Sequence, residues 1–135
     1  VLDWDFWIRV SRSWRVAWLA APTVQVRWHS ASETHRFKTS RDDLDETRRL
    51  LADLFDQDGP GHPRRERLIR QGQSRLARAF LNRTHDAIHN SQPKLARDCL
   101  LEAVSLSPKT ALTSLADPRF GWQVAILLLR TMLPR

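Results

Sequence analysis

Residues 1–29 contain the side chains of this chain whose types and spacing suit chemistry. Asp3 and Asp5 stand among bulky residues in the stretch Asp3-Trp4-Asp5-Phe6-Trp7. In one interpretation Asp3 caps a helix and Asp5 lies in its first turn, because both carboxylates would meet unpaired N–H groups and the positive end of the helix dipole. In the other, the aromatic rings exclude water from a carboxylate, which raises its pKa and makes it a usable base.

Two stretches after the predicted helix have the composition of β-strands. Residues 14–19 form a β-prone run, Pro22 breaks it, and residues 23–28 alternate like a half-buried strand that ends at His29. The predicted order is therefore acid, helix, strand, proline, strand and histidine. We expect a short β-hairpin-like part near the amino terminus of a mainly α-helical chain.

This order resembles the end of the catalytic domain of inverting family 2 glycosyltransferases. That family has an acidic residue at a D-x-D/W-x-W-L-R-type helix, then a strand, a proline-containing bend and an R-x-H ending. The matching pieces here are residues 3–9, residues 16–19, Pro22 and Arg27-Trp28-His29. The family usually has Glu before the aspartate, where this chain has Leu2. The resemblance covers about a fifth of the chain.

The resemblance implies the carboxyl-terminal part of an α/β nucleotide-diphospho-sugar transferase domain of the GT-A type. It implies inverting transfer of a sugar from a nucleotide-sugar donor to a hydroxyl of a glycan or lipid-linked acceptor. Asp3 would be the general base, and His29 would help to bind the Mg²⁺ or Mn²⁺ that neutralises the diphosphate leaving group. Supporting residues would be Trp4, Asp5 and Arg27. The nucleotide-binding half and its D-x-D acids would lie upstream, so we expect these residues alone to be inactive.

The composition fits one domain with a core: 135 residues, 41% of them hydrophobic, with six tryptophans. The chain begins with Val and shows no signal peptide, so we expect a fragment or a trimmed domain. A single cysteine, Cys99, excludes an internal disulfide and a Cys-rich zinc site, and indicates a reducing compartment. We therefore predict a cytoplasmic protein that can lie at the inner face of the membrane.

The positive charge belongs to the second half of the chain. Residues 1–60 carry 9 basic and 10 acidic side chains, a balance of −1, whereas residues 61–135 carry 13 and 5, a balance of +8. A solvated helix face explains this best, peripheral contact with an anionic membrane ranks second, and nucleic acid ranks third because residues 64–79 contain no aromatic side chain for base stacking. The densest basic run is Arg64, Arg65, Arg67, Arg70, Arg75, Arg78 and Arg83.

The rest of the chain predicts helices. A capping box at Ser40 and Asp43 opens one over residues 40–56, and the Gly- and Pro-rich residues 56–63 form a linker. We place the domain boundary there, with residues 1–58 as the end of the catalytic domain and residues 59–135 as a helical extension.

The extension has the pattern of a helical bundle with one hairpin. The pattern predicts a helix over residues 64–90, with Gly72 as a kink or joint, then a turn at residues 90–93 and a second helix that ends before Ser107-Pro108. Together these elements resemble a single tetratricopeptide repeat. Asp117 caps a last, apolar helix. The alternative function is therefore a non-enzymatic helical protein-interaction module, in which Asp3 is only a cap and His29 only ends a strand.

His85 and His89 have the i, i+4 spacing of metal ligands on a helix. A zinc protease needs Glu where Asp86 stands and a third ligand downstream, and no such ligand is evident in the sequence. The two histidines are therefore interpreted as partly exposed helix residues. Cys99 lies on an apolar helix face and is interpreted as a small hydrophobic residue.

Overall fold

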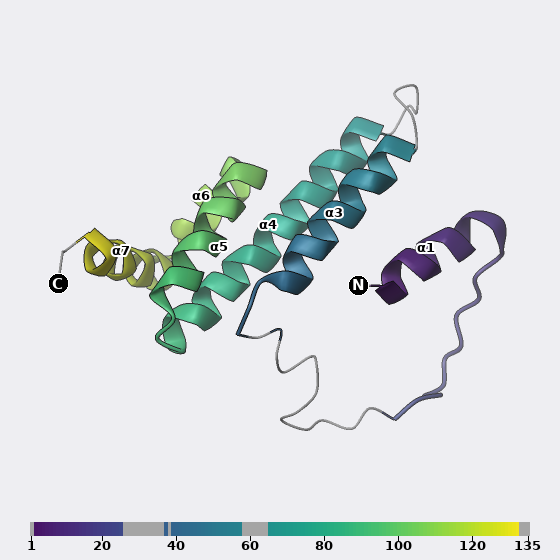
Figure 1. The fold of residues 1–135 in the computed structure, drawn as a ribbon, viewed down its shortest axis with the longest axis horizontal. Coiled ribbons are helices and arrows are strands. Elements are labelled where there is room, and N and C mark those ends of the chain that lie inside the picture. Colours follow the sequence, from purple (N-terminus) through teal and green to yellow (C-terminus); the bar gives the residue numbers. More distant parts are fainter. Residues whose placement is uncertain (1, 26–36, 38, 58–64, 133–135) are drawn as a thin grey trace.

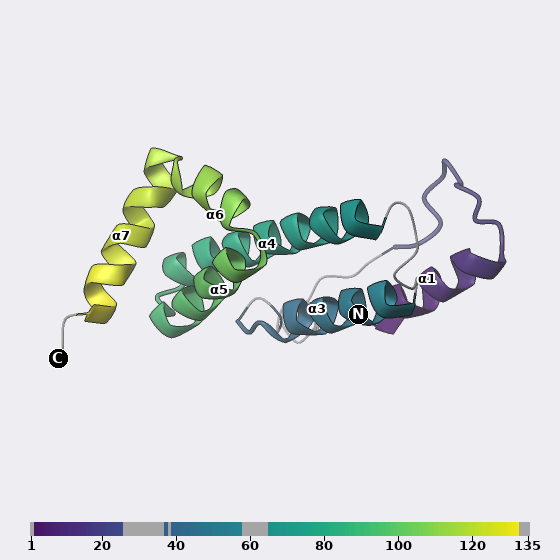
Figure 2. The same ribbon diagram turned by 90° about the horizontal axis from the view of Figure 1, so that it is seen from above.

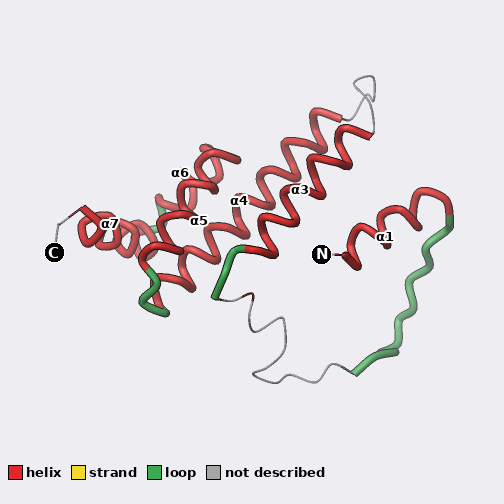
Figure 3. Tube along the Cα trace, in the orientation of Figure 1, coloured by secondary structure: helices red, strands yellow, loops and turns green. Residues whose placement is uncertain are grey.

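The computed structural model of the chain describes residues 2–25, 37, 39–57 and 65–132. Helix α1 spans Leu2–Ser13 and α3 spans Asp42–Gln57. The following four are α4 (Arg65–His89), α5 (Pro93–Leu106), α6 (Pro108–Leu115) and α7 (Pro118–Met132). Within the described ranges the structure has no strand (Figure 3), so the mainly α-helical prediction is confirmed.

The predicted β-hairpin is not seen. Residues 15–19 and 22–25 have no regular secondary structure, and residues 26–28 lie outside the described ranges. The apolar side chains of this segment are exposed, with Trp18 at 91% and Val24 at 77%. A strand needs a partner for its backbone groups, and an isolated two-stranded hairpin is only marginally stable. In the described structure this β-prone segment has no neighbouring strand with which its backbone groups could pair.

Helices α3, α4 and α5 form the body of the molecule. Helices α3 and α4 lie side by side and antiparallel, and α5 returns along α4 (Figures 1 and 2). The main core cluster joins Leu44 of α3 to Phe80 of α4 and Leu100 of α5. The core therefore extends across the predicted boundary between residues 58 and 59. Among the described residues no helix is both long and apolar enough to cross a membrane.

Gly72 is not a joint between two helices. Helix α4 continues without interruption from Arg65 to His89. At Gly72 the ring of Phe55 from α3 comes so close that a Cβ would lie 3.2 Å from its Cζ atom. The missing side chain thus permits close packing of α3 on α4, which the sequence pattern did not indicate.

The predicted hairpin of α4 and α5 is confirmed. Ser91 adopts a left-handed conformation with φ of 55°. Its N–H donates to the Ile88 carbonyl at 3.1 Å, and the N–H of Gln92 donates to the Ala87 carbonyl at 2.8 Å. This pair of hydrogen bonds is a Schellman motif, which satisfies the last carbonyls of α4 and reverses the chain.

Side-chain caps start the two last helices. Ser107 is the N-cap of α6, and its hydroxyl accepts from the Thr110 N–H at 3.4 Å. Asp117 caps α7 as predicted, since its carboxylate accepts from the N–H of Arg119 at 2.8 Å. Helix α6 was not predicted, although Ser107 followed by Pro108 is itself a helix-start signal.

The start of α3 differs from the predicted capping box. The Ser40 hydroxyl accepts from the Asp42 N–H at 3.4 Å, and the helix begins at Asp42. Asp43 instead pairs with Arg83 of α4, whose guanidinium also donates to the carbonyls of Phe37 and Ser40. The carboxylate of Asp43, which the local pattern assigned to the helix cap, therefore forms a long-range ion pair instead.

Candidate functional site

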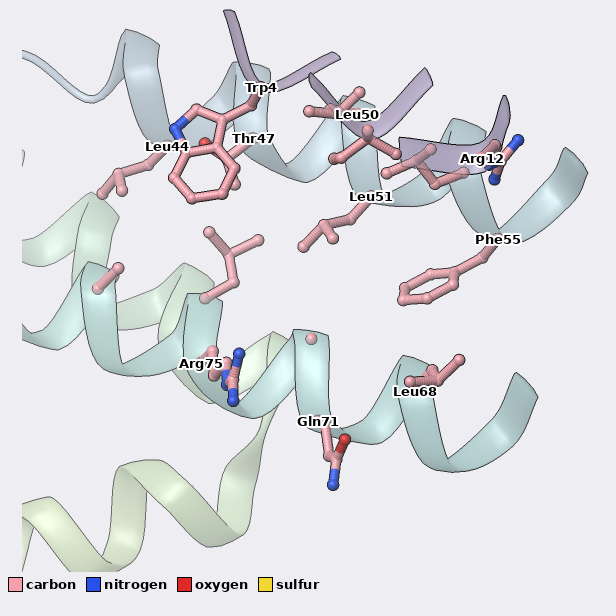
Figure 4. A pocket seen from close by; sticks show the side chains of 15 residues that line it. Trp4, Arg12, Leu44, Thr47, Leu50, Leu51, Phe55, Leu68, Gln71 and Arg75 are labelled. Atoms are coloured by element: carbon pink, nitrogen blue, oxygen red, sulfur yellow. The ribbon is translucent and has the colours of Figure 1, made fainter. Parts of the chain in front are cut away.

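Helix α1 carries the predicted catalytic residue and has two contrasting faces. One face contributes Trp4, Ile8 and Arg12 to a groove above α3 and α4 (Figure 4). These residues are four apart and so share one side of the helix. Asp3, Phe6 and Trp7 are related by three- and four-residue steps and lie together on the other side. The helix itself is as the sequence predicted.

The outer face of α1 combines a carboxylate with two aromatic rings. Asp3 is exposed in the first helical turn, and the rings of Phe6 and Trp7 meet edge to face with centroids 5.1 Å apart. Trp7 is 61% exposed. The carboxylate is therefore open to water and not enclosed by rings. A carboxylate beside exposed aromatic faces can accept a proton from a hydroxyl while a flat apolar surface contacts the rings.

Asp3 is not the residue that precedes the helix. Helix α1 begins at Leu2, so Asp3 and Asp5 both lie within its first turn, where the helix dipole favours negative charge. Asp5 forms an ion pair with Arg9 one turn later, with Oδ2 and Nη2 2.6 Å apart. This ion pair agrees with the interpretation in which Asp5 has a structural role in the first turn of the helix.

The groove under α1 is lined mainly by apolar side chains. Leu51 and Phe55 of α3 point into it from one side, and Leu68 of α4 borders the other side (Figure 4). Its volume is about 610 Å³, which is within the range of small-molecule sites. Arg12 and Arg75 also line it. The groove can accept an apolar group close to positive charge.

The sequence predicted the apolar stripe of α3 but not this groove. Leu44, Leu50, Leu51, Leu54 and Phe55 recur at helical spacing, which is typical of the apolar face of a helix. Leu44 alone of these five is buried in the structure, and all five line the groove. The sequence signal for the groove would have been the width of the apolar stripe on α3, which is greater than α4 alone can cover.

The predicted metal ligand cannot be placed. Arg27 and His29 lie outside the described residues, so nothing here relates them to Asp3. In the described part of the chain, no group of three or more His, Cys, Asp or Glu side chains is arranged to hold a metal ion. Asp3 and Asp5 therefore do not form a cation site by themselves.

A polar cluster covers Cys99 at the junction of α3, α4 and α5. Arg41 makes a bidentate pair with Asp45 at 2.7 and 2.8 Å, which raises the pKa of the guanidinium further. Arg41 also reaches Glu102 of α5 at 3.5 Å. Cys99 is fully buried, and burial raises its pKa to about 11 although Arg41 and Arg83 oppose the change. The thiol stays protonated at neutral pH and is the small hydrophobic residue that the sequence indicated.

Comparisons with known proteins do not identify a family. Neither a protein-family model, a curated protein nor a solved structure matches this chain. The fold by itself defines a helical domain with an amino-terminal helix set over an apolar groove.

Proposed function

We propose that this chain is part of an inverting family 2 glycosyltransferase, with residues 1–58 at the end of the catalytic domain and residues 59–135 as a helical extension. The observation that carries the proposal is the outer face of α1. It presents the exposed carboxylate of Asp3 beside Phe6 and Trp7, within the motif that resembles the family. Aromatic rings can stack on the apolar face of a sugar while a carboxylate meets its hydroxyl groups.

Asp3 acts as the general base in this proposal. Its carboxylate takes the proton of an acceptor hydroxyl as that oxygen attacks the anomeric carbon of the donor sugar. The bond between the anomeric carbon and the diphosphate breaks in the same displacement, which inverts the configuration. The resemblance also implies Mg²⁺ or Mn²⁺ bound with the help of His29. His29 lies outside the described residues, and the described residues contain no group of three or more His, Cys, Asp or Glu side chains that could hold this ion, so no step is assigned to it here.

The exposed apolar side chains of residues 14–25 support the same proposal. Trp14, Val16, Trp18 and Leu19 are each at least 70% exposed. Exposed apolar residues of this density are typical of a surface that binds a protein, a membrane or a ligand. In a GT-A domain the covering surface would be the nucleotide-binding half, whose sheet would also give residues 14–19 a strand partner.

The test uses the gene product that contains this chain. Release of nucleoside diphosphate is measured with a panel of sugar nucleotides and acceptors in the presence of Mn²⁺. Asp3→Asn should lower the transfer rate about 100- to 10,000-fold, the usual contribution of a general base. The control Asp53→Asn removes an exposed carboxylate from α3 and should leave the rate unchanged. Transfer that survives Asp3→Asn at the wild-type rate would refute the role of Asp3.

A helical protein-interaction module is the second candidate, and the groove under α1 favours it. Three α1 residues at positions i, i+4 and i+8 line the groove, and this is the spacing of an amphipathic helix that is bound in a groove. The occupant would be a partner helix with bulky apolar residues at this spacing, which would take the place of α1.

A labelled peptide of residues 2–13 tests this second candidate. Its binding is followed by fluorescence anisotropy on a full chain that carries Trp4→Ala and Ile8→Ala, so that the chain's own α1 competes only weakly for the groove. The wild-type peptide should bind, and a peptide with Trp4→Ala and Ile8→Ala should bind at least about tenfold more weakly because it lacks the apolar anchors. Equal binding of the two peptides, or no binding of either, would exclude the groove as a helix-binding site. Neither result depends on Asp3, so the two proposals fail separately.

A further inference from the structure

We infer that His85 and His89 of α4, together with Gln123 of α7, form a binding site for a borderline divalent metal ion such as Zn²⁺. The two imidazole rings lie one helical turn apart on the surface of α4, and their Nε2 atoms are 3.1 Å apart. The amide of Gln123 reaches the same place from α7, with its nitrogen 3.5 Å from Nε2 of His89. The site is separate from α1 and from the groove, and it goes beyond the proposed transferase function.

The distance between the imidazole nitrogens suits a shared ion. Histidine binds Zn²⁺ at about 2.0–2.1 Å, so two imidazoles on one ion at roughly 90–110° have their nitrogens about 2.9–3.4 Å apart. The observed 3.1 Å lies within this range. In the absence of an ion the same geometry lets one imidazole donate a hydrogen bond to the other. Metal binding replaces that shared proton and requires no change of backbone.

Asp86 favours the correct tautomer of His85. Its carboxylate Oδ1 is 3.8 Å from Nδ1 of His85, on the side of the ring away from the shared position. A carboxylate on that side favours a proton on Nδ1, which leaves the Nε2 lone pair for the metal. At this distance the carboxylate acts on His85 through its charge and not through a hydrogen bond.

Gln123 supplies the third group. Its Oε1 atom is buried without a hydrogen-bond partner, while its Nε2 faces His89. The oxygen and nitrogen of a carboxamide have nearly the same shape, and rotation of the amide by half a turn exchanges them. The oxygen then faces the shared position as a neutral ligand. In the structure the nitrogen, and not the oxygen, lies near His89, so the amide has to rotate before its oxygen can bind the ion.

Two of the three proposed ligands, His85 and Gln123, border a hollow. His85 and Gln123 line a depression of about 450 Å³ together with Asn82 and Asp117. Two histidines and one amide leave at least one position for water, whereas a structural zinc site has four protein ligands. Because the ligands come from α4 and α7, the bound ion fastens the last helix to the hairpin.

The experiment measures Zn²⁺ binding to the full chain by isothermal titration calorimetry and unfolding by circular dichroism, with and without Zn²⁺. We expect binding at one site and a higher melting temperature with Zn²⁺, because the ion binds the folded state. His85→Ala and His89→Ala should each weaken binding about tenfold or more. Gln123→Ala should weaken it less, and Gln123→Glu should strengthen it because a carboxylate replaces the amide oxygen.

Control variants separate this site from the other histidines. His35→Ala and His62→Ala remove imidazoles elsewhere in the sequence and should leave the affinity unchanged. His85→Gln and His89→Gln repeat the test with polar side chains of similar size, and far-UV circular dichroism without Zn²⁺ verifies that each variant folds. Wild-type affinity in the His85 and His89 variants would overturn the site. Wild-type affinity in both Gln123 variants would overturn the link between α4 and α7.

Discussion

The guanidinium of Arg83 in α4 pairs with the carboxylate of Asp43 in α3, with Nη2 and Oδ2 3.0 Å apart. The same guanidinium donates to the carbonyls of Phe37 and Ser40, and its side chain is only 12% exposed. The side chain of Arg83 thus binds the backbone of the residues that lead into α3. The first turn of α3 depends on a residue 40 positions further along the sequence.

Arg83→Ala should destabilise the fold by roughly 2–3 kcal/mol. Loss of one partner of a fully buried ion pair costs about 3–5 kcal/mol, and the partial exposure of Asp43 lowers that figure here. Urea unfolding followed by circular dichroism measures the change. Arg78→Ala, which removes an exposed arginine of the same helix, is the matched control and should cost less than about 0.5 kcal/mol. Equal effects of the two substitutions would contradict the anchoring role of Arg83.

Gly121→Ala should destabilise the protein although alanine is the better helix former. A Cβ at this position would lie 2.5 Å from the backbone oxygen of Leu115, so α6 and α7 would have to move apart. We expect a cost of about 1–3 kcal/mol from such overpacking. Thermal unfolding provides the measurement.

Gly72→Ala is the comparison for Gly121→Ala. Its Cβ would meet the ring of Phe55 at 3.2 Å, and a side chain can move more easily than a backbone carbonyl. The Gly72 variant should therefore lose less stability than the Gly121 variant. A larger loss of stability in the Gly72 variant than in the Gly121 variant would show that the contact between α6 and α7 is not the tighter of the two.

Ser91→Gly should stabilise the protein by about 0.5–1 kcal/mol. Ser91 has φ of 55°, a conformation that glycine adopts without the steric cost paid by other residues. Ser91→Ala keeps a Cβ and should give no such gain. Chemical denaturation of the two variants decides the point, and a Gly variant no more stable than wild type would argue against the left-handed turn.

Stability should fall in alkaline solution as Cys99 ionises. Burial raises the pKa of its thiol from 9.0 to about 11, so the folded state favours the neutral thiol. This contribution is complete below pH 9 and is lost as the pH rises through 11, with a change on the order of 2 kcal/mol. Urea unfolding of wild type and Cys99→Ala between pH 8 and 11 isolates the effect. Parallel pH profiles for the two proteins would contradict it.

The local elements of this fold could be predicted because their signals are local. Asp117 followed by Pro118 starts α7 as expected, and the turn at residues 90–93 joins two helices as expected. Helix caps and turns depend on hydrogen bonds between residues a few positions apart, so a single stretch of sequence contains both partners. The helix that carries Asp3 was predicted for the same reason.

The strands and the sites depend on partners far away in the chain. Residues 14–19 have strand composition but find no strand to pair with in the described structure. The role of Asp3 in catalysis stays a proposal because Arg27 and His29 are not placed relative to it.

The sequence by itself determined the helical hairpin, the capped ends of its helices and the one-turn spacing of His85 and His89. Only the tertiary structure decided that Gln123 of α7 lies beside His89, that Arg83 holds Asp43, and that a groove remains open between α3 and α4. The physical reason is the range of the interactions. Periodicity fixes which residues share a helix face, whereas packing between helices fixes what that face meets.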